Sequence, residues 1–79
     1  MDTTKANLPL KKQSRIQVRN RKRIMDAALI VFSENGYRGA TLDQIARESG
    51  LSKPNILYYF EGKKNIHLAL LSQFFLIDY

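Results

Sequence analysis

Apolar residues recur three and four positions apart in the middle of the chain, which predicts one long helix. The helix is expected to begin near Ser14, whose hydroxyl suits an N-cap, and to end near Asn35. Gly36 then supplies a left-handed stop, and residues 37–40 form a connector. The residues that define the buried stripe of this helix are Ile24, Ala27, Ala28, Val31 and Phe32.

Two short helices follow, and both carry clear capping signals. Thr41 and Gln44 predict a capping box at the start of the second helix, and Gly50 ends that helix. A third helix is expected to begin after Ser52, a further N-cap residue, and to end near Phe60.

Two short helices joined by a tight turn around Gly50 have the layout of a helix-turn-helix, here over about residues 42–61. Leu51 and Ile56 are expected to fill the wedge between the two helices. A fourth helix begins near Lys63, and no strand-like alternation appears anywhere. The sequence therefore predicts an all-α fold, a three-helix helix-turn-helix head plus the start of a fourth linking helix. The pattern alone also fits a plain three-helix core that reads no DNA.

Positive charge gathers at the beginning of the chain, which has 79 residues and a formal net charge of +6. Residues 1–23 hold eight basic residues and one acidic residue, a net of +7, and residues 24–79 hold five and six, a net of −1. Such a basic segment attracts polyanions, either nucleic acid or an anionic membrane, or serves only as a solvated tail. The expected divisions are a disordered basic arm (1–13), the helix-turn-helix domain (14–62) and the fourth helix (63–79).

Several classes of protein are made improbable by the composition. The chain has no cysteine, so neither a disulfide nor a thiolate metal site is expected. It shows no secretory signal and no run of about 18 apolar residues, so we expect a cytoplasmic protein that does not span a membrane. His67 is the single histidine, and carboxylates do not cluster, so we expect no enzyme activity, no metal and no cofactor.

One face of the third helix offers the chemistry that reads base edges. Projection at about 100° per residue turns Ile56 and Phe60 toward the core and leaves an outward face. An amide suits the adenine edge, an ammonium suits guanine acceptors, and apolar side chains suit thymine methyls. The residues expected to read bases in double-stranded DNA are Lys53, Pro54, Asn55, Leu57 and Tyr58.

A second set of residues suits phosphate oxygens, because hydroxyls and lysines stand near the starts of the helices. Lys63 is unfavourable for the dipole of the fourth helix unless an anion lies close to it. For Tyr59, packing in a small core is an equally good interpretation. The residues expected to contact phosphates are Thr41, Ser52, Tyr59, Lys63 and Lys64.

Taken together, these residues resemble the TetR (tetracycline-repressor-like) family over roughly residues 20–72. The matching run is Ile24-x-x-Ala27-Ala28-x-x-Val31-Phe32-x-x-x-Gly36-Tyr37, Thr41-x-x-x-Ile45-Ala46, Gly50-Leu51-Ser52 and Tyr59-Phe60-x-x-Lys63. The resemblance implies a homodimeric repressor whose N-terminal head reads an operator. A fourth helix would link that head to a C-terminal domain that binds a small-molecule inducer and dimerises.

The resemblance also assigns residues and shows departures. It places phosphate contacts on Thr41, Tyr59 and Lys63. It places base readout on Lys53, Pro54, Asn55, Leu57 and Tyr58 of the third helix. The family's usual tyrosine is Leu57 here, its usual polar cap before Lys63 is Gly62, and its usual acidic residue after that lysine is Lys64. The stretch 53–60 is further similar to the pyrimidine-utilisation regulator subgroup, whose ligand is a pyrimidine base.

Such proteins have two domains of ordinary size, so we expect this chain to be a fragment that ends within the fourth helix. An apolar surface on that helix would then be left bare, formed by Leu70, Leu71, Phe74, Phe75 and Ile77. The competing function is a helical protein-interaction module whose basic arm binds polyanions or membranes without specificity.

Overall fold

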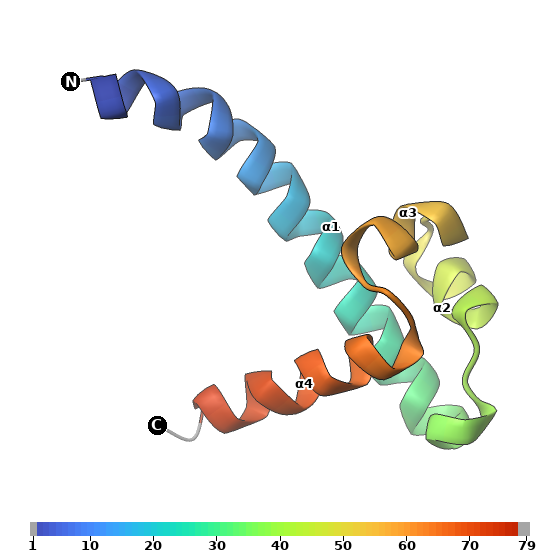
Figure 1. Cartoon of the computed structure of the whole chain (residues 1–79). Helices are drawn as coiled ribbons and strands as arrows, with labels where there is room; N and C mark the ends of the chain where they lie inside the picture. The colour runs from blue at the N-terminus through green and yellow to red at the C-terminus, as the bar shows by residue number, and fades with distance from the viewer. Residues whose placement is uncertain (1, 78–79) are drawn as a thin grey trace.

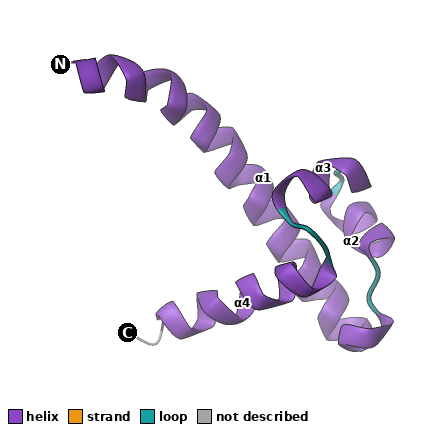
Figure 2. Ribbon diagram, viewed as in Figure 1, coloured by secondary structure: helices purple, strands orange, loops and turns teal. Residues whose placement is uncertain are grey.

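The computed structural model describes residues 2–77, and the side chains of residues 15–73. Its four helices are α1 (Asp2–Gly39), α2 (Leu42–Ser49), α3 (Lys53–Tyr59) and α4 (Lys63–Ile77). Between residues 2 and 77 the chain contains no strand (Figure 2), so the predicted all-α fold is confirmed. The helices are joined by short connections at residues 40–41, 50–52 and 60–62.

The long α1 is the scaffold of the fold. α2, α3 and α4 gather around its second half, and its first part projects beyond them (Figure 1). α2 and α3 lie together on one side of α1, and α4 runs back across it. The helix-turn-helix therefore packs against one side of the long helix α1, and α4 packs against α1 as well.

The beginning of α1 differs from the prediction. A disordered arm over residues 1–13 and a helix start near Ser14 were expected, whereas the helix begins at Asp2 and includes residues 2–13. These residues contain no glycine, and seven of the twelve are the good helix formers Ala, Leu, Lys and Gln. Pro9 is the one strong helix breaker among them, and it interrupts the hydrogen-bond ladder without ending the helix.

Gly36 is the point at which α1 changes direction. Its φ of 74° confirms the predicted positive φ, but its ψ of 166° is extended rather than left-handed helical. This combination is open essentially to glycine alone, because a Cβ would crowd the neighbouring backbone. The chain then makes a further helical turn to Gly39 where a connector was expected. Gly36 thus redirects the chain toward α2 without ending its helical run.

The predicted caps of α2 and α3 are confirmed. Gln44 N donates to Thr41 Oγ1 (3.1 Å), and Thr41 N donates to Gln44 Oε1 (2.8 Å), which completes the capping box. Gly50, with φ 77° and ψ 12°, is the left-handed C-cap of α2. Ser52 caps α3 by accepting from Asn55 N (3.2 Å). Local sequence therefore fixes both ends of the turn between α2 and α3.

Each helix contributes one fully buried isoleucine to the core. These residues are Ile24, Ile45, Ile56 and Ile66, each 0% exposed. All five residues of the predicted stripe on α1 belong to or pack against this core, with Phe32 at its margin. Leu70, expected on a bare apolar face, is instead buried because α4 packs on α1, whereas Leu71 is 41% exposed. The side chains of Phe74, Phe75 and Ile77 lie outside the described residues.

Candidate nucleic-acid interface

The buried side of α3 determines which of its residues face solvent. Ile56 and Phe60 are buried and hold the short helix against α1 and α2. The opposite side presents Lys53, Pro54, Leu57 and Tyr58, all exposed; Tyr58 is the most open at 70%. Of the five residues expected to read bases, Asn55 lies at the margin and is half-buried. The structure thus brings the five residues to one short helix with four of them free toward solvent.

Two hydroxyls lie beside this face at the starts of α2 and α3. Thr41 Oγ1 and Ser52 Oγ each accept one hydrogen bond from a backbone N–H of the helix that they cap. Both residues are exposed. A hydroxyl that accepts retains its own hydrogen to donate, so each cap can serve a phosphate oxygen at the same time. Lys64, at the start of α4, is also exposed.

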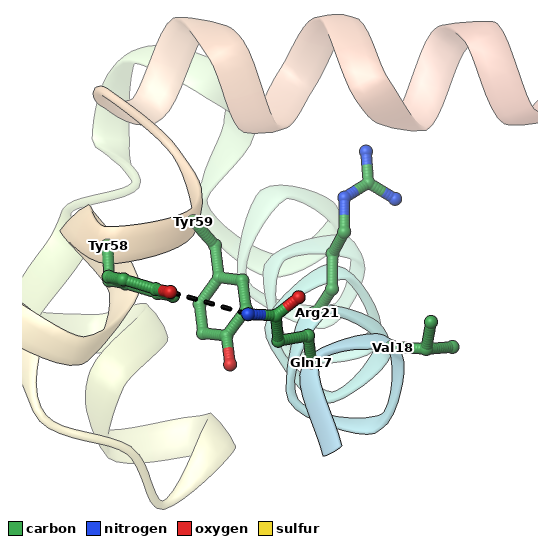
Figure 3. Close-up of a pocket in the computed structure, with 5 residues that line it drawn as sticks. All are labelled: Gln17, Val18, Arg21, Tyr58 and Tyr59. Atoms are coloured by element: carbon green, nitrogen blue, oxygen red, sulfur yellow. Dashed lines mark hydrogen bonds between the residues drawn. The ribbon is translucent and has the colours of Figure 1, made fainter. Parts of the chain in front are cut away.

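The two tyrosines of α3 contact the scaffold helix as well as each other. Gln17 Nε2 donates to Tyr58 Oη (3.3 Å), and Asn20 Nδ2 donates to Tyr59 Oη (3.2 Å). The two rings meet edge to face with centroids 5.0 Å apart. Figure 3 shows the shallow pocket between the helices, with Gln17 pointing at the Tyr58 hydroxyl and Arg21 along the same side of α1.

Lys63 has a structural role that the sequence did not suggest. Its Nζ donates to the backbone oxygens of Tyr37 (2.7 Å) and Ala40 (3.0 Å), and lies 4.4 Å from the centre of the Tyr37 ring. One carbonyl in the last turn of α1 and one just after that helix therefore accept hydrogen bonds from the ammonium group. An ammonium has three N–H donors, so one hydrogen remains for a DNA contact.

We expect Lys63→Met to lower the free energy of unfolding by about 1–2 kcal/mol, because two charge-assisted hydrogen bonds disappear at a partly exposed site. Lys64→Met is the matched control, since it removes the same charge from the next, exposed position. Urea unfolding followed by circular dichroism compares the two variants. Equal stability of the two variants would show that the contacts of Lys63 contribute nothing.

Two arginines of α1 also support the interface and were missed by sequence reasoning. Arg23 Nη2 donates to the backbone oxygen of Ser49 (2.7 Å), at the turn between α2 and α3. Arg21 places its guanidinium 5.1 Å from the centre of the Phe60 ring. In the sequence both belong to the basic run before Ile24 and look like parts of an electrostatic arm. Only the packing of α1 against the turn distinguishes them from solvated charges.

The remaining charged and aromatic residues near the site form two smaller groups. Lys53 Nζ lies 3.8 Å from Asp43 Oδ1, an exposed ion pair that links α3 to α2 and contributes little by itself. His67 packs against Phe32 and Tyr37, with ring centroids 5.5 and 4.8 Å away.

Among the described residues no group of His, Asp and Glu could hold a metal ion. No helix among them is long and apolar enough to cross a membrane.

A match to a family model identifies the protein family of this chain. Residues 24–70, which include the core, the helix-turn-helix and the start of α4, match the model described as "Bacterial regulatory proteins, tetR family". The chain belongs to the TetR family. It carries the N-terminal DNA-binding domain of that family, so the resemblance that the sequence motifs suggested is confirmed at this level.

Individual TetR-family proteins agree with this assignment. The chain is 45% identical over 62 residues to the HTH-type transcriptional regulator RutR of Escherichia coli K12, covering 78% of this chain and 29% of RutR. It is 44% identical over 45 residues to IcaR of Staphylococcus aureus Newman, the negative transcriptional regulator of the biofilm operon icaADBC, covering 57% of this chain and 24% of IcaR.

A solved structure supports the same TetR-type fold. A crystal structure of an HlyIIR mutant protein superposes with a TM-score of 0.68 at 31% identity, over 70% of this chain and 31% of that one. The chain thus spans less than a third of the length of each of these three proteins.

Proposed function

We propose that this TetR-family chain binds double-stranded DNA in a sequence-specific manner, with α3 in the major groove. The observation that carries the proposal is the two-sided construction of α3. Its buried side, Ile56 and Phe60, fixes the helix to the scaffold, and its exposed side offers a lysine, a proline, a leucine and a phenol. A helix fits the major groove, where each base pair displays a distinct pattern of donors, acceptors and methyl groups.

Within this proposal the interface residues divide into two sets. Side chains at the tip and along the outward face of α3 read base edges: Lys53, Pro54, Asn55, Leu57 and Tyr58. Hydroxyls and ammonium groups at the starts of the helices, with one phenol, contact phosphates: Thr41, Ser52, Tyr59, Lys63 and Lys64. The phosphate contacts position the helix, and the base contacts provide specificity.

We further propose that the full regulator is a cytoplasmic, homodimeric repressor released by a small molecule. IcaR, one of the relatives, is itself named as a negative regulator. The proposed dimer contacts and inducer site would lie in the part of the relatives that this chain does not span. The similarity of residues 53–60 to pyrimidine-utilisation regulators makes a pyrimidine base the first inducer to test.

Selection from a random duplex library, followed by titration at several salt concentrations, tests the proposal. We expect one enriched sequence, and an affinity whose logarithm falls linearly with the logarithm of salt, by about 0.9 for each phosphate neutralised. The control is a scrambled duplex of equal length, which should bind more weakly with a similar salt slope. Affinity that does not change with salt would contradict the proposal. Equal binding to heparin and to every duplex would favour a non-specific polyanion-binding module.

A further inference from the structure

Two carboxamides of α1 face the two phenols of α3, and together they form matched pairs. Gln17 and Asn20 are three residues apart and so lie on the same side of α1. Each donates to a different tyrosine, Gln17 to Tyr58 (3.3 Å) and Asn20 to Tyr59 (3.2 Å). These contacts join residues 41 and 39 positions apart in the chain, so they depend on how α1 packs on α3.

The direction of these hydrogen bonds has a chemical consequence. A carboxamide nitrogen donates hydrogen bonds and cannot accept them, so the phenolic O–H cannot donate to that nitrogen. Each phenol therefore uses an oxygen lone pair toward α1 and keeps its O–H available for another acceptor. For Tyr58, which is 70% exposed, the acceptor is free to be a base edge or a phosphate, and for half-buried Tyr59 the nearest type of acceptor in DNA is a phosphate.

The same contacts also restrict how the rings move. The edge-to-face contact between the two rings, at 5.0 Å and 86°, fixes their relative orientation. A hydrogen bond to each hydroxyl then fixes where the far end of each ring lies. A side chain that is already ordered loses less conformational freedom when it binds, so the contact with DNA gains affinity.

We infer that Gln17 and Asn20 are positioning residues for DNA binding. Each holds a tyrosine of α3 with its hydroxyl hydrogen directed away from α1 and toward the duplex. The inference rests on the proposed function, because it concerns how the same face of α3 contacts DNA. It also gives the N-terminal part of α1 a role in readout that does not require α1 to touch the DNA.

A double-mutant cycle tests the pairing of Asn20 with Tyr59 on the duplex chosen by selection. We expect Asn20→Ala and Tyr59→Phe each to weaken binding about threefold to tenfold, the size of one hydrogen bond, and the double variant to lose little more than either one. Asn20→Asp should weaken binding further, because a carboxylate accepts the phenolic hydrogen and withdraws it from DNA. The excess loss should disappear in the Tyr59→Phe background, which separates it from simple repulsion of phosphate.

The crossed pairs provide the control. Asn20→Ala combined with Tyr58→Phe should give additive losses of affinity, and so should Gln17→Ala combined with Tyr59→Phe. In each of these combinations the two residues share no hydrogen bond. In the free protein, Tyr59→Phe should shift the nitrogen-15 signals of the Asn20 carboxamide and leave those of Gln17 in place. Thermal melting of each variant verifies that the fold is retained.

The outcomes separate this inference from the proposed function. If the unmodified chain binds no duplex selectively, the proposed function fails. If it binds selectively with the expected salt dependence, but Asn20→Ala and Tyr59→Phe are additive, the positioning role alone is overturned. An Asn20→Asp loss that persists unchanged in the Tyr59→Phe background would likewise overturn it.

Discussion

Ile56→Ala should lower the free energy of unfolding by about 2–5 kcal/mol, the usual range for removing three carbons from a packed core. Ile56 is 0% exposed and is the one residue of α3, apart from its C-cap Phe60, that is buried. Small domains have total stabilities of roughly 5–15 kcal/mol, so this single change removes a large share. DNA binding should fall in parallel, because α3 has no other buried residue within its span.

Leu57→Ala is the matched control for that experiment. It removes a similar volume from the next residue, which is 44% exposed on the outward face. We expect stability to change by less than about 1 kcal/mol and affinity for the selected duplex to fall several-fold. Urea unfolding and fluorescence anisotropy measure the two quantities on both variants. Comparable destabilisation by the two substitutions would show that the inward and outward faces of α3 are wrongly assigned.

Gly50→Ala should lower the free energy of unfolding by about 2–4 kcal/mol, from two causes that act together. The residue has a φ of 77°, which places the new Cβ too close to its own carbonyl. That Cβ would also lie 2.9 Å from Arg23 Nη2, the atom that donates to Ser49 O. The guanidinium, at the end of a flexible side chain, must move away from this methyl group, and we expect its hydrogen bond to the turn to be weakened.

Two comparisons isolate these causes. Gly62→Ala places a methyl group where no atom lies within 4 Å and where φ is not positive, so its stability should be nearly unchanged. In an Arg23→Ala background the Gly50→Ala loss should shrink to the backbone strain alone, about 1–2 kcal/mol. Thermal and urea unfolding of the four variants provide the values. A Gly50→Ala loss that is the same with and without Arg23 would rule out the contact as a cause.

The parts of the fold that the sequence predicted well are those set by neighbouring residues. The Thr41 capping box, the left-handed Gly50 and the Ser52 cap each depend on residues within four positions, and all are present. The helix start expected near Ser14 differs from the structure, in which α1 begins at Asp2. Seven of residues 2–13 are the good helix formers Ala, Leu, Lys and Gln, whereas Pro9 and the polar residues are the features that suggested a later start.

The interface shows a similar division between local and distant information. The outward face of α3 followed from helical geometry, and exposure of Leu57 and Tyr58 agrees with it. The partners of Arg23 and Lys63 did not follow, because each reaches a backbone oxygen 23 to 26 residues away. A backbone carbonyl is present at every position, so no residue type in the sequence marks it as an acceptor. The contact roles of the proposed DNA-binding residues stay predictions until they are measured.

The short connections at residues 40–41, 50–52 and 60–62 have a consequence for how fast the chain folds. Closing a loop of two or three residues loses little chain entropy, and neighbouring helices meet almost as soon as they form. Helical proteins rich in such local contacts fold within about microseconds to milliseconds. The contacts that close longer stretches of chain are the packing of α4 on α1 and the hydrogen bonds of Gln17 and Asn20 to α3. The surface proposed to read DNA is thus complete only when α3 has packed against α1, and not when the turn between α2 and α3 has formed.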